Sequence, residues 1–153
     1  MKLGDDYERA TPARILLVED SPSDQELTRE AFAEVRLVNA IDVVETGEEA
    51  LDFLYRRGSY GAAARPDVIL LDLNLPGLDG REVLATIKGD EDLKRIPVIV
   101  LTTSDDEHDI YRSYGMHANC YITKPVDFRK FIAAMEILQT FWLNLVKLPP
   151  NRH

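Results

Sequence analysis

Five short apolar runs divide the chain, and between them hydrophobic residues recur at spacings of three and four. A continuous apolar run of about four residues is typical of a strand that is buried on both faces. A spacing of three and four is typical of a helix with one buried stripe. Strands that alternate with helices predict a parallel sheet covered by helices on both faces. The runs comprise residues 15–18, 41–44, 68–71 and 98–101 and, more weakly, 121–122.

The predicted helices begin at recognisable cap sequences. Serine is a typical N-cap residue and proline suits the first helical position, so the first helix begins at Ser21-Pro22. The second starts after Thr46-Gly47 and the third after Asp79-Gly80. A polar fourth helix is expected at residues 105–116, and a long, strongly apolar fifth helix at residues 127–147. On the first helix, the residues expected in the buried stripe are Leu27, Ala31 and Val35, flanked by Thr28 and Phe32.

This order of elements predicts the α/β fold class. Right-handed crossovers leave few topologies for a chain of this size. We therefore expect a flavodoxin-like, doubly wound five-stranded parallel sheet in the order 2-1-3-4-5, with five helices in a single domain. The domain is expected to span residues 13–148, with an extended C-terminal helix. Residues 1–12 are expected to form a flexible N-terminal arm and residues 149–153 a tail.

Composition narrows the range of partners and locations. The 153 residues include 18 basic and 27 acidic side chains, a net charge of -9. Binding to nucleic acid depends on lysine and arginine that neutralise phosphates, so we expect no nucleic-acid partner. No apolar run approaches the ~18 residues of a membrane span, and residues 1–14 lack the apolar core of a signal peptide. The single cysteine, Cys120, suits a reducing compartment. We therefore expect a soluble, cytoplasmic protein with no membrane contact.

Polar side chains follow the predicted strands where each strand ends. Glu19 and Asp20 follow the first strand, Asp72 the third, Thr102 the fourth and Lys124 the fifth. Open parallel sheets place their sites at the carboxyl ends of the strands, beside the topological switch between strands one and three. Taken singly, an aspartate after a strand is more often a helix cap or turn residue. Their convergence favours a site with three carboxylates, a hydroxyl and an ammonium.

Such a cluster limits the chemistry that the site can perform. Three neighbouring carboxylates cannot all stay ionised without a counterion, and Mg²⁺ with oxygen ligands supplies one. A lysine and a threonine hydroxyl can hold phosphoryl oxygens, so the set favours phosphoryl transfer onto a carboxylate, which gives an acyl phosphate. The sequence contains no nucleotide-binding glycine loop. The phosphoryl donor is therefore expected to be another protein or a small phosphodonor.

Four motifs carry a resemblance to a known family. They are LLVEDS (16–21), LLDLNLPGLDG (70–80), PVIVLTTS (97–104) and YITKP (121–125). With these motifs in this order, the chain resembles the CheY-like receiver domain of two-component response regulators over about residues 13–143. The resemblance implies a domain that catalyses its own aspartyl phosphorylation and dephosphorylation but acts mainly as a signalling switch. Whether to class it as an enzyme is left open.

The resemblance implies a role for each matching residue. Asp72 is the expected phospho-acceptor, and Asp20 and Asp72 are expected to coordinate Mg²⁺ directly. Glu19 would act on the metal through water, and the backbone carbonyl of Asn74 would complete the protein ligands.

Other matching positions concern the switch. Thr102 is the expected switch hydroxyl, Lys124 the family's lysine, and Tyr121 its switch aromatic. Pro125 is expected to follow a cis peptide bond. Phosphorylation is expected to repack the face formed by the fourth helix, the fifth strand and the fifth helix.

A narrower resemblance concerns the partner. The stretches RPDVILLDLNLPGLDGREVL, IPVIVLTTS and NCYITKPVD are similar to the single-domain regulators paired with phytochromes, the Rcp type. This resemblance implies a phytochrome-type sensor histidine kinase as partner and its phosphohistidine as donor. The residues alone indicate only a histidine kinase or an acyl-phosphate donor.

The C-terminal helix carries more apolar side chains than one buried stripe requires. An unpaired apolar surface usually marks an interface, so we expect a homodimer. The alternative is that the last turn folds back and covers its own apolar residues. The candidate interface residues are Phe141, Trp142, Leu145 and Leu148.

Three alternative functions stay open. A haloacid-dehalogenase-type phosphatase would need Asp-x-Asp after the first strand and a cap insertion, whereas this chain has Glu19-Asp20-Ser21-Pro22. A flavodoxin-type redox carrier would need a hydroxyl-rich phosphate loop at a place where Glu19 and Asp20 would repel a flavin phosphate. A pure interaction module would neither bind Mg²⁺ nor respond to phosphodonors.

Overall fold

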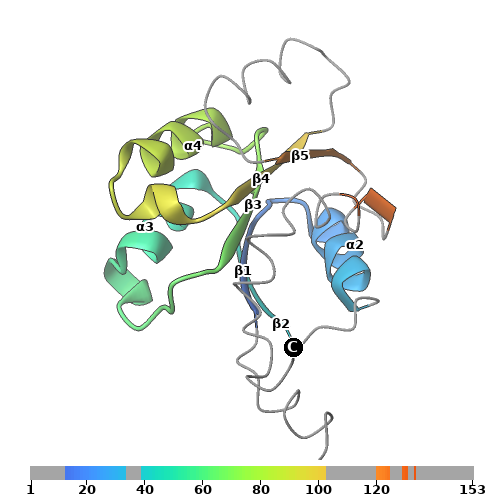
Figure 1. Ribbon diagram of the computed structural model, residues 1–153, viewed down its shortest axis with the longest axis horizontal. Coiled ribbons are helices and arrows are strands. Elements are labelled where there is room, and N and C mark those ends of the chain that lie inside the picture. Colours follow the sequence, from blue (N-terminus) through green and yellow to red (C-terminus); the bar gives the residue numbers. More distant parts are fainter. Residues whose placement is uncertain (1–12, 34–38, 103–119, 125–128, 131–132, 134–153) are drawn as a thin grey trace, which may run out of the picture.

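One parallel sheet of five strands organises the fold, in the order β2-β1-β3-β4-β5 (Figure 1). The computed structural model describes residues 13–33, 39–102, 120–124, 129–130 and 133. The predicted fold class and strand order are confirmed. The strands are β1 (Ala13–Val18), β2 (Asn39–Val44), β3 (Val68–Asp72), β4 (Val98–Thr102) and β5 (Cys120–Thr123).

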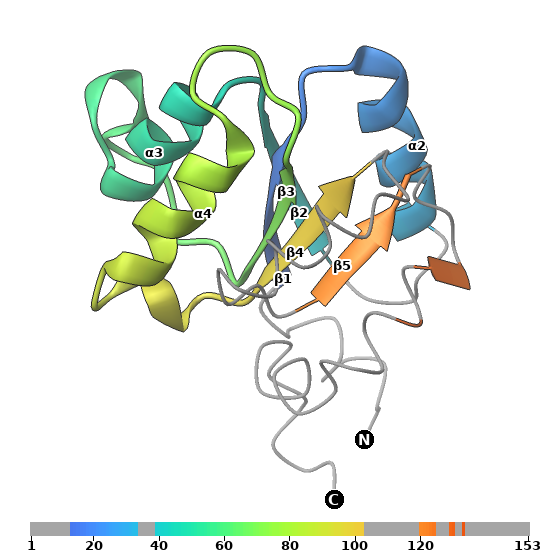
Figure 2. The same ribbon diagram turned by 90° about the horizontal axis from the view of Figure 1, so that it is seen from above.

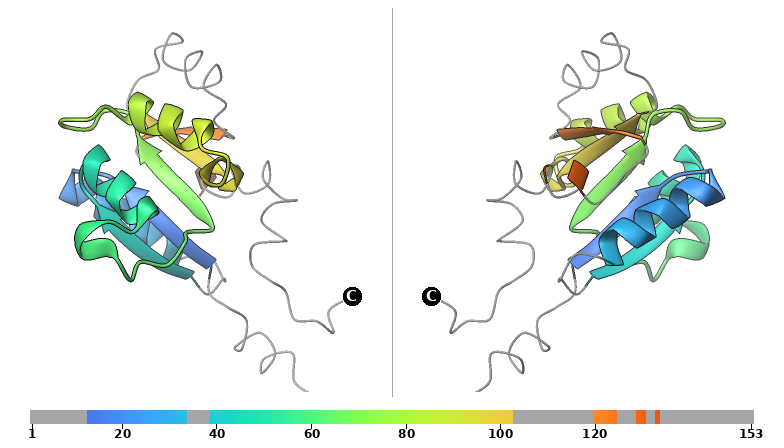
Figure 3. Two further views of the ribbon diagram at one scale, coloured as in Figure 1. Left: turned by 90° about the vertical axis from the view of Figure 1, so that its left-hand side faces the viewer. Right: turned by 90° about the vertical axis from the view of Figure 1, so that its right-hand side faces the viewer.

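Helices pack on both faces of the sheet (Figure 2). The helix α2 (Pro22–Ala33) covers one face, and α3 (Gly47–Tyr55) and α4 (Gly80–Gly89) cover the other. Figure 3 shows α3 and α4 from one side of the molecule and α2 from the opposite side. Successive strand residues therefore enter different cores: Leu17 and Leu70 pack with the α2 side, whereas Leu16 and Leu71 pack with the α3 and α4 side.

The remaining helical segments are short or fall largely outside the described residues. Two 3₁₀ helices, η1 (Gly58–Tyr60) and η2 (Leu93–Arg95), lie in the connections that follow α3 and α4. The predicted fourth helix lies outside the described residues. Of the predicted fifth helix only 129–130 and 133 are described, and these are helical. Across the described part of the chain, no helix has the length and hydrophobicity needed to cross a bilayer.

The buried face of α2 differs from the prediction. Thr28, Ala31 and Phe32 are buried, whereas Leu27 is 40% exposed, and Val35 lies outside the described residues. Thr28 can be buried because its hydroxyl donates to the Asp24 carbonyl oxygen at 2.9 Å, which satisfies its polar group. The buried stripe of α2 therefore includes Thr28 in place of Leu27, and the prediction that Leu27 is buried is wrong.

The edge strand β2 is less buried than its apolar sequence predicted. Ile41 and Val43 are half-buried and Asp42 is exposed, whereas Val44 is fully buried. By contrast, every residue of the central strand β3 is buried. The difference follows from position in the sheet, since β2 has one neighbouring strand and β3 has two.

The N-terminus of α4 packs directly against the end of β3. Asp79 caps the helix by accepting from the Arg81 backbone N–H at 3.0 Å, and Glu82 accepts from the Asp79 N–H at 3.2 Å. Gly80 packs so closely that a Cβ there would collide with the backbone of Asp72 and Leu73. The helix can therefore begin directly against the end of β3.

Candidate functional site

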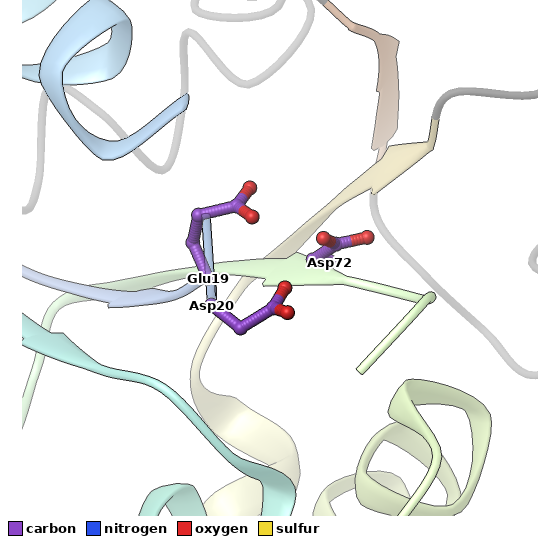
Figure 4. A group of neighbouring side chains, drawn as sticks. All are labelled: Glu19, Asp20 and Asp72. Carbon is purple, nitrogen blue, oxygen red and sulfur yellow. The ribbon is translucent and has the colours of Figure 1, made fainter. Parts of the chain in front are cut away.

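The predicted polar residues meet at the carboxyl edge of the sheet. Glu19 and Asp20 follow β1, Asp72 is the last residue of β3, and Lys124 follows β5. Since β1 pairs with both β2 and β3, Glu19 and Asp20 lie beside the topological switch. Figure 4 shows the carboxyl groups of Glu19, Asp20 and Asp72 at the ends of these neighbouring strands.

The three carboxyl groups are close enough to share a cation. One oxygen from each of Glu19, Asp20 and Asp72 lies within 4.8 Å of the others. Glu19 and Asp72 are buried, whereas Asp20 is exposed, so the group opens to solvent on one side. An all-oxygen set with one solvent-accessible carboxylate fits a hard divalent cation that keeps some of its water.

Lys124 supplies the positive charge at this site. Its Nζ lies 2.8 Å from Oδ2 of Asp72 and 3.0 Å from Oδ2 of Asp24, and it forms a third ion pair with Glu19. Burial opposes the ammonium charge, but the hydrogen bonds to Asp72, Glu19 and Asp24 outweigh it and hold the pKa of Lys124 above its usual value. The lysine therefore stays charged in the described structure.

Glu19 is the carboxyl group that burial affects most strongly. Its side chain is fully buried, and this desolvation raises its pKa from 4.5 to about 7. The hydrogen bond from Lys124 lowers the pKa, the charge of Asp72 raises it, and the Ser21 backbone N–H, which donates to Oε2 at 3.1 Å, lowers it. Glu19 consequently exchanges a proton near neutral pH.

Both oxygens of Asp72 are held by donors. Oδ1 accepts from the Asn74 backbone N–H at 2.9 Å, and Oδ2 accepts from Lys124. The loop after β3 is anchored where the Leu78 N–H donates to Oε2 of Glu48 at 3.2 Å. The carboxylate is thus fixed on both sides without being neutralised by a second lysine or arginine among the described residues.

Asp24 also belongs to this site, although the sequence analysis did not select it. It stands in the first turn of α2, and its carboxylate lies 3.0 Å from Nζ of Lys124. The available signal was its position: a helix that begins at Pro22 starts at the same sheet edge as Asp20. An acidic residue in a first helical turn is common, because it interacts favourably with the helix dipole, and the signal was therefore ambiguous.

Two predicted switch residues are described only through their backbone. Thr102 ends β4 and pairs with Thr123, which places it at the carboxyl edge of the sheet. Tyr121 lies in β5 and pairs with Val100. Their side chains lie outside the described structure, as do Pro125 and the proposed interface residues Phe141, Trp142, Leu145 and Leu148.

Comparisons with known proteins agree with this geometry. Residues 15–136 match the response regulator receiver domain. The chain is 46% identical over 138 residues to the response regulator Rcp1 of Synechocystis sp., and the match covers 90% of this chain and 94% of Rcp1. The Mn²⁺-bound form of Rcp1 superimposes with a TM-score of 0.75 at 46% identity, covering 90% of this chain and 99% of that one.

Two further solved structures are similar over most of the chain. One is the phosphorylated cyanobacterial phytochrome response regulator RcpA, with a TM-score of 0.75, 47% identity and coverage of 91% of this chain and 99% of that one. The other is the bacteriophytochrome response regulator RtBRR, with a TM-score of 0.79, 44% identity and coverage of 92% and 86%. By sequence match and by fold, this chain belongs to the response regulator receiver domain family.

Proposed function

We propose that this chain is a stand-alone response regulator that accepts a phosphoryl group on Asp72. The observation that carries the proposal is the contact of a buried lysine with a buried carboxylate, Lys124 with Asp72 at 2.8 Å, beside an acidic cluster. A paired lysine can hold an incoming phosphoryl oxygen, and the cluster can hold the cation that phosphoryl transfer needs. The receiver family of the chain supports this reading.

In the proposed reaction a carboxylate oxygen of Asp72 attacks the phosphorus atom of a phosphohistidine. The new O–P bond forms as the P–N bond breaks, and the imidazole leaves with the electron pair and takes up a proton from solvent. Lys124 and the hydroxyl of Thr102 hold the oxygens of the transferred group. Glu19, Asp20, Asp72 and the carbonyl of Asn74 would hold Mg²⁺, which when bound neutralises charge on the phosphoryl oxygens.

The proposed partner is a phytochrome-type sensor histidine kinase. Support comes from RcpA and RtBRR, which are described as phytochrome and bacteriophytochrome response regulators. Thr102 and Tyr121 are proposed to carry the switch to the face formed by β5 and the two predicted C-terminal helices. A homodimer through residues 141–148, the domain limits 13–148 and a cytoplasmic location stay predictions.

Intact-mass spectrometry after incubation with Mg²⁺ and acetyl phosphate tests the proposal. We expect one added phosphoryl group on the wild-type chain, and none after omission of Mg²⁺ or in Asp72→Asn. Asp42→Asn is the matched control, because Asp42 is an exposed aspartate on the edge strand β2, and it should be phosphorylated like the wild type. An adduct that persists in Asp72→Asn would contradict Asp72 as the acceptor. Absence of an adduct, together with absence of beryllofluoride binding, would favour a pure interaction module.

A further inference from the structure

Lys124 is shared by three carboxylates that differ in their surroundings. The side chains of Glu19 and Asp72 are 0% and 3% exposed, whereas that of Asp24 is 31% exposed. Asp72 is the last residue of β3 and Glu19 directly follows β1, whereas Asp24 belongs to α2. The three contacts match the number of N–H donors on a lysine ammonium.

A phosphoryl group on Asp72 would bring three further acceptor oxygens to this ammonium. The N–H that Asp72 now accepts can pass to one of these oxygens, because an acylated Asp72 no longer carries a carboxylate charge; a second N–H must come from Glu19 or Asp24. Withdrawal from Glu19 would leave a fully buried carboxylate without this donor, which is unfavourable. Withdrawal from Asp24 is less unfavourable, because water can reach the partly exposed carboxylate and replace the lost donor.

We infer that Asp24 is a positioning residue that holds Lys124 in the unphosphorylated protein and gives it up when the phosphoryl group arrives. This inference rests on the proposed function. Asp24 would thus shift the equilibrium between the unphosphorylated and phosphorylated protein, because the Asp24–Lys124 pair stabilises only the unphosphorylated form. The negative charge of Asp24 also repels the phosphoryl group, and this repulsion likewise favours the unphosphorylated protein.

The helix itself stays attached when the pair is broken. The Gln25 side-chain amide donates to the Glu19 carbonyl oxygen at 2.7 Å and to Oε2 of Glu45 at 3.2 Å. The buried side chains of Ala31 and Phe32 pack against the sheet. Substitution of Asp24 is therefore expected to leave the fold intact.

The experiment measures binding of beryllofluoride, a phosphoryl mimic, to the full chain at saturating Mg²⁺. Asp24→Asn and Asp24→Ala are compared with Glu26→Gln, which removes the same charge from an exposed position on α2. We expect Asp24→Asn and Asp24→Ala to bind beryllofluoride about two- to fivefold more tightly, the effect of losing one partly exposed ion pair. Glu26→Gln should bind like the wild type, and Asp24→Glu should restore the wild-type affinity.

Thermal unfolding provides the second measurement. The Asp24 variants should lower the melting temperature of the free protein and leave that of the beryllofluoride complex close to the wild-type value. An equal loss of melting temperature in the free protein and in the complex would show that the Asp24–Lys124 pair persists, and would overturn the inference. So would a beryllofluoride affinity of the Asp24→Asn and Asp24→Ala variants that equals that of Glu26→Gln or is weaker than that of the wild type. Failure of the wild type itself to bind beryllofluoride would instead overturn the proposed function and this inference with it.

Discussion

The ammonium of Lys124 lies 2.8 Å from Oδ2 of Asp72, although the two residues are 52 positions apart in the chain. The sheet makes this contact possible: β4 pairs with both β3 and β5, so the two residues project from strands separated by one neighbour. Two buried charges that approach from different strands stabilise each other only in the folded chain. Disrupting this contact should therefore affect both the stability of the fold and the chemistry of the site.

Substitution of Lys124 should be strongly destabilising. Lys124→Met leaves Glu19 and Asp72 buried without their counter-charge, and we expect a loss of about 3–5 kcal/mol in the free energy of unfolding. Mg²⁺ should recover part of this loss, since a bound cation replaces the missing charge. Urea denaturation with and without Mg²⁺ checks both statements.

Lys94→Ala is the control for that experiment. Lys94 forms an ion pair with Glu91 in which the side chains are 45% and 90% exposed, and such pairs contribute about 0–1 kcal/mol. A loss for Lys124→Met as small as that for Lys94→Ala would contradict the buried charge cluster.

The raised pKa of Glu19 predicts how stability depends on pH. Between pH 4.5 and about 7 the folded protein holds a proton on Glu19 that the unfolded chain has already lost. Its contribution to stability is thus fully present below pH 4.5 and is lost as pH rises through about 7. We expect a contribution on the order of 1–3 kcal/mol. Urea titrations in EDTA across this range should show the fall, and Glu19→Gln should remove it; an equal slope in Glu19→Gln would assign the pH dependence to other groups.

Mg²⁺ binding should release protons near neutral pH. A cation in the acidic cluster favours the ionised form of Glu19, whose pKa of about 7 leaves it partly protonated in the free protein. The affinity for Mg²⁺ should therefore rise with pH, by at most about tenfold per unit for one competing proton. Calorimetry at pH 6 and pH 8 in buffers of different ionisation enthalpy measures the release. Binding without proton exchange would mean that Glu19 does not face the cation.

Two glycines of α4 should respond in opposite ways to the same substitution. A Cβ at Gly80 would collide with the backbone of Asp72 and Leu73, so Gly80→Ala should cost about 1–3 kcal/mol or more and weaken Mg²⁺ binding. A Cβ at Gly89 meets nothing within 4 Å among the described residues, and Gly89→Ala should be neutral or stabilising by up to ~1 kcal/mol. Thermal unfolding compares them, and similar effects would show that the close approach at Gly80 is not limiting.

The sequence was sufficient to predict the sheet and the position of the site. Buried parallel strands appear as apolar runs, and their polar ends must meet at one edge once the strand order is known. Glu19, Asp20, Asp72 and Lys124 were selected in this way and lie together. Their roles, like those of Thr102 and Tyr121, stay predictions.

Other features depended on contacts that periodicity does not encode. Thr28 is buried in place of Leu27 because a local hydrogen bond to the Asp24 carbonyl satisfies its hydroxyl. Asp24 contacts Lys124, which is 100 positions away in the chain. From the sequence alone, an acidic residue in a first helical turn is already explained by its favourable interaction with the helix dipole. Half-burial of β2 followed from its edge position, which is a property of the sheet and not of its apolar sequence.

The ending of β3 has a consequence for how the chain selects its register. The strand reads VILLD and is buried at every residue, so it lacks the alternation of polar and apolar positions that fixes register in half-buried strands. Its single ionisable residue, Asp72, finds a buried counter-charge in Lys124. A slip of one residue would move that carboxylate to the opposite face of the sheet, away from Lys124. The ion pair between Asp72 and Lys124 is therefore expected to favour the native register of β3 over a register shifted by one residue.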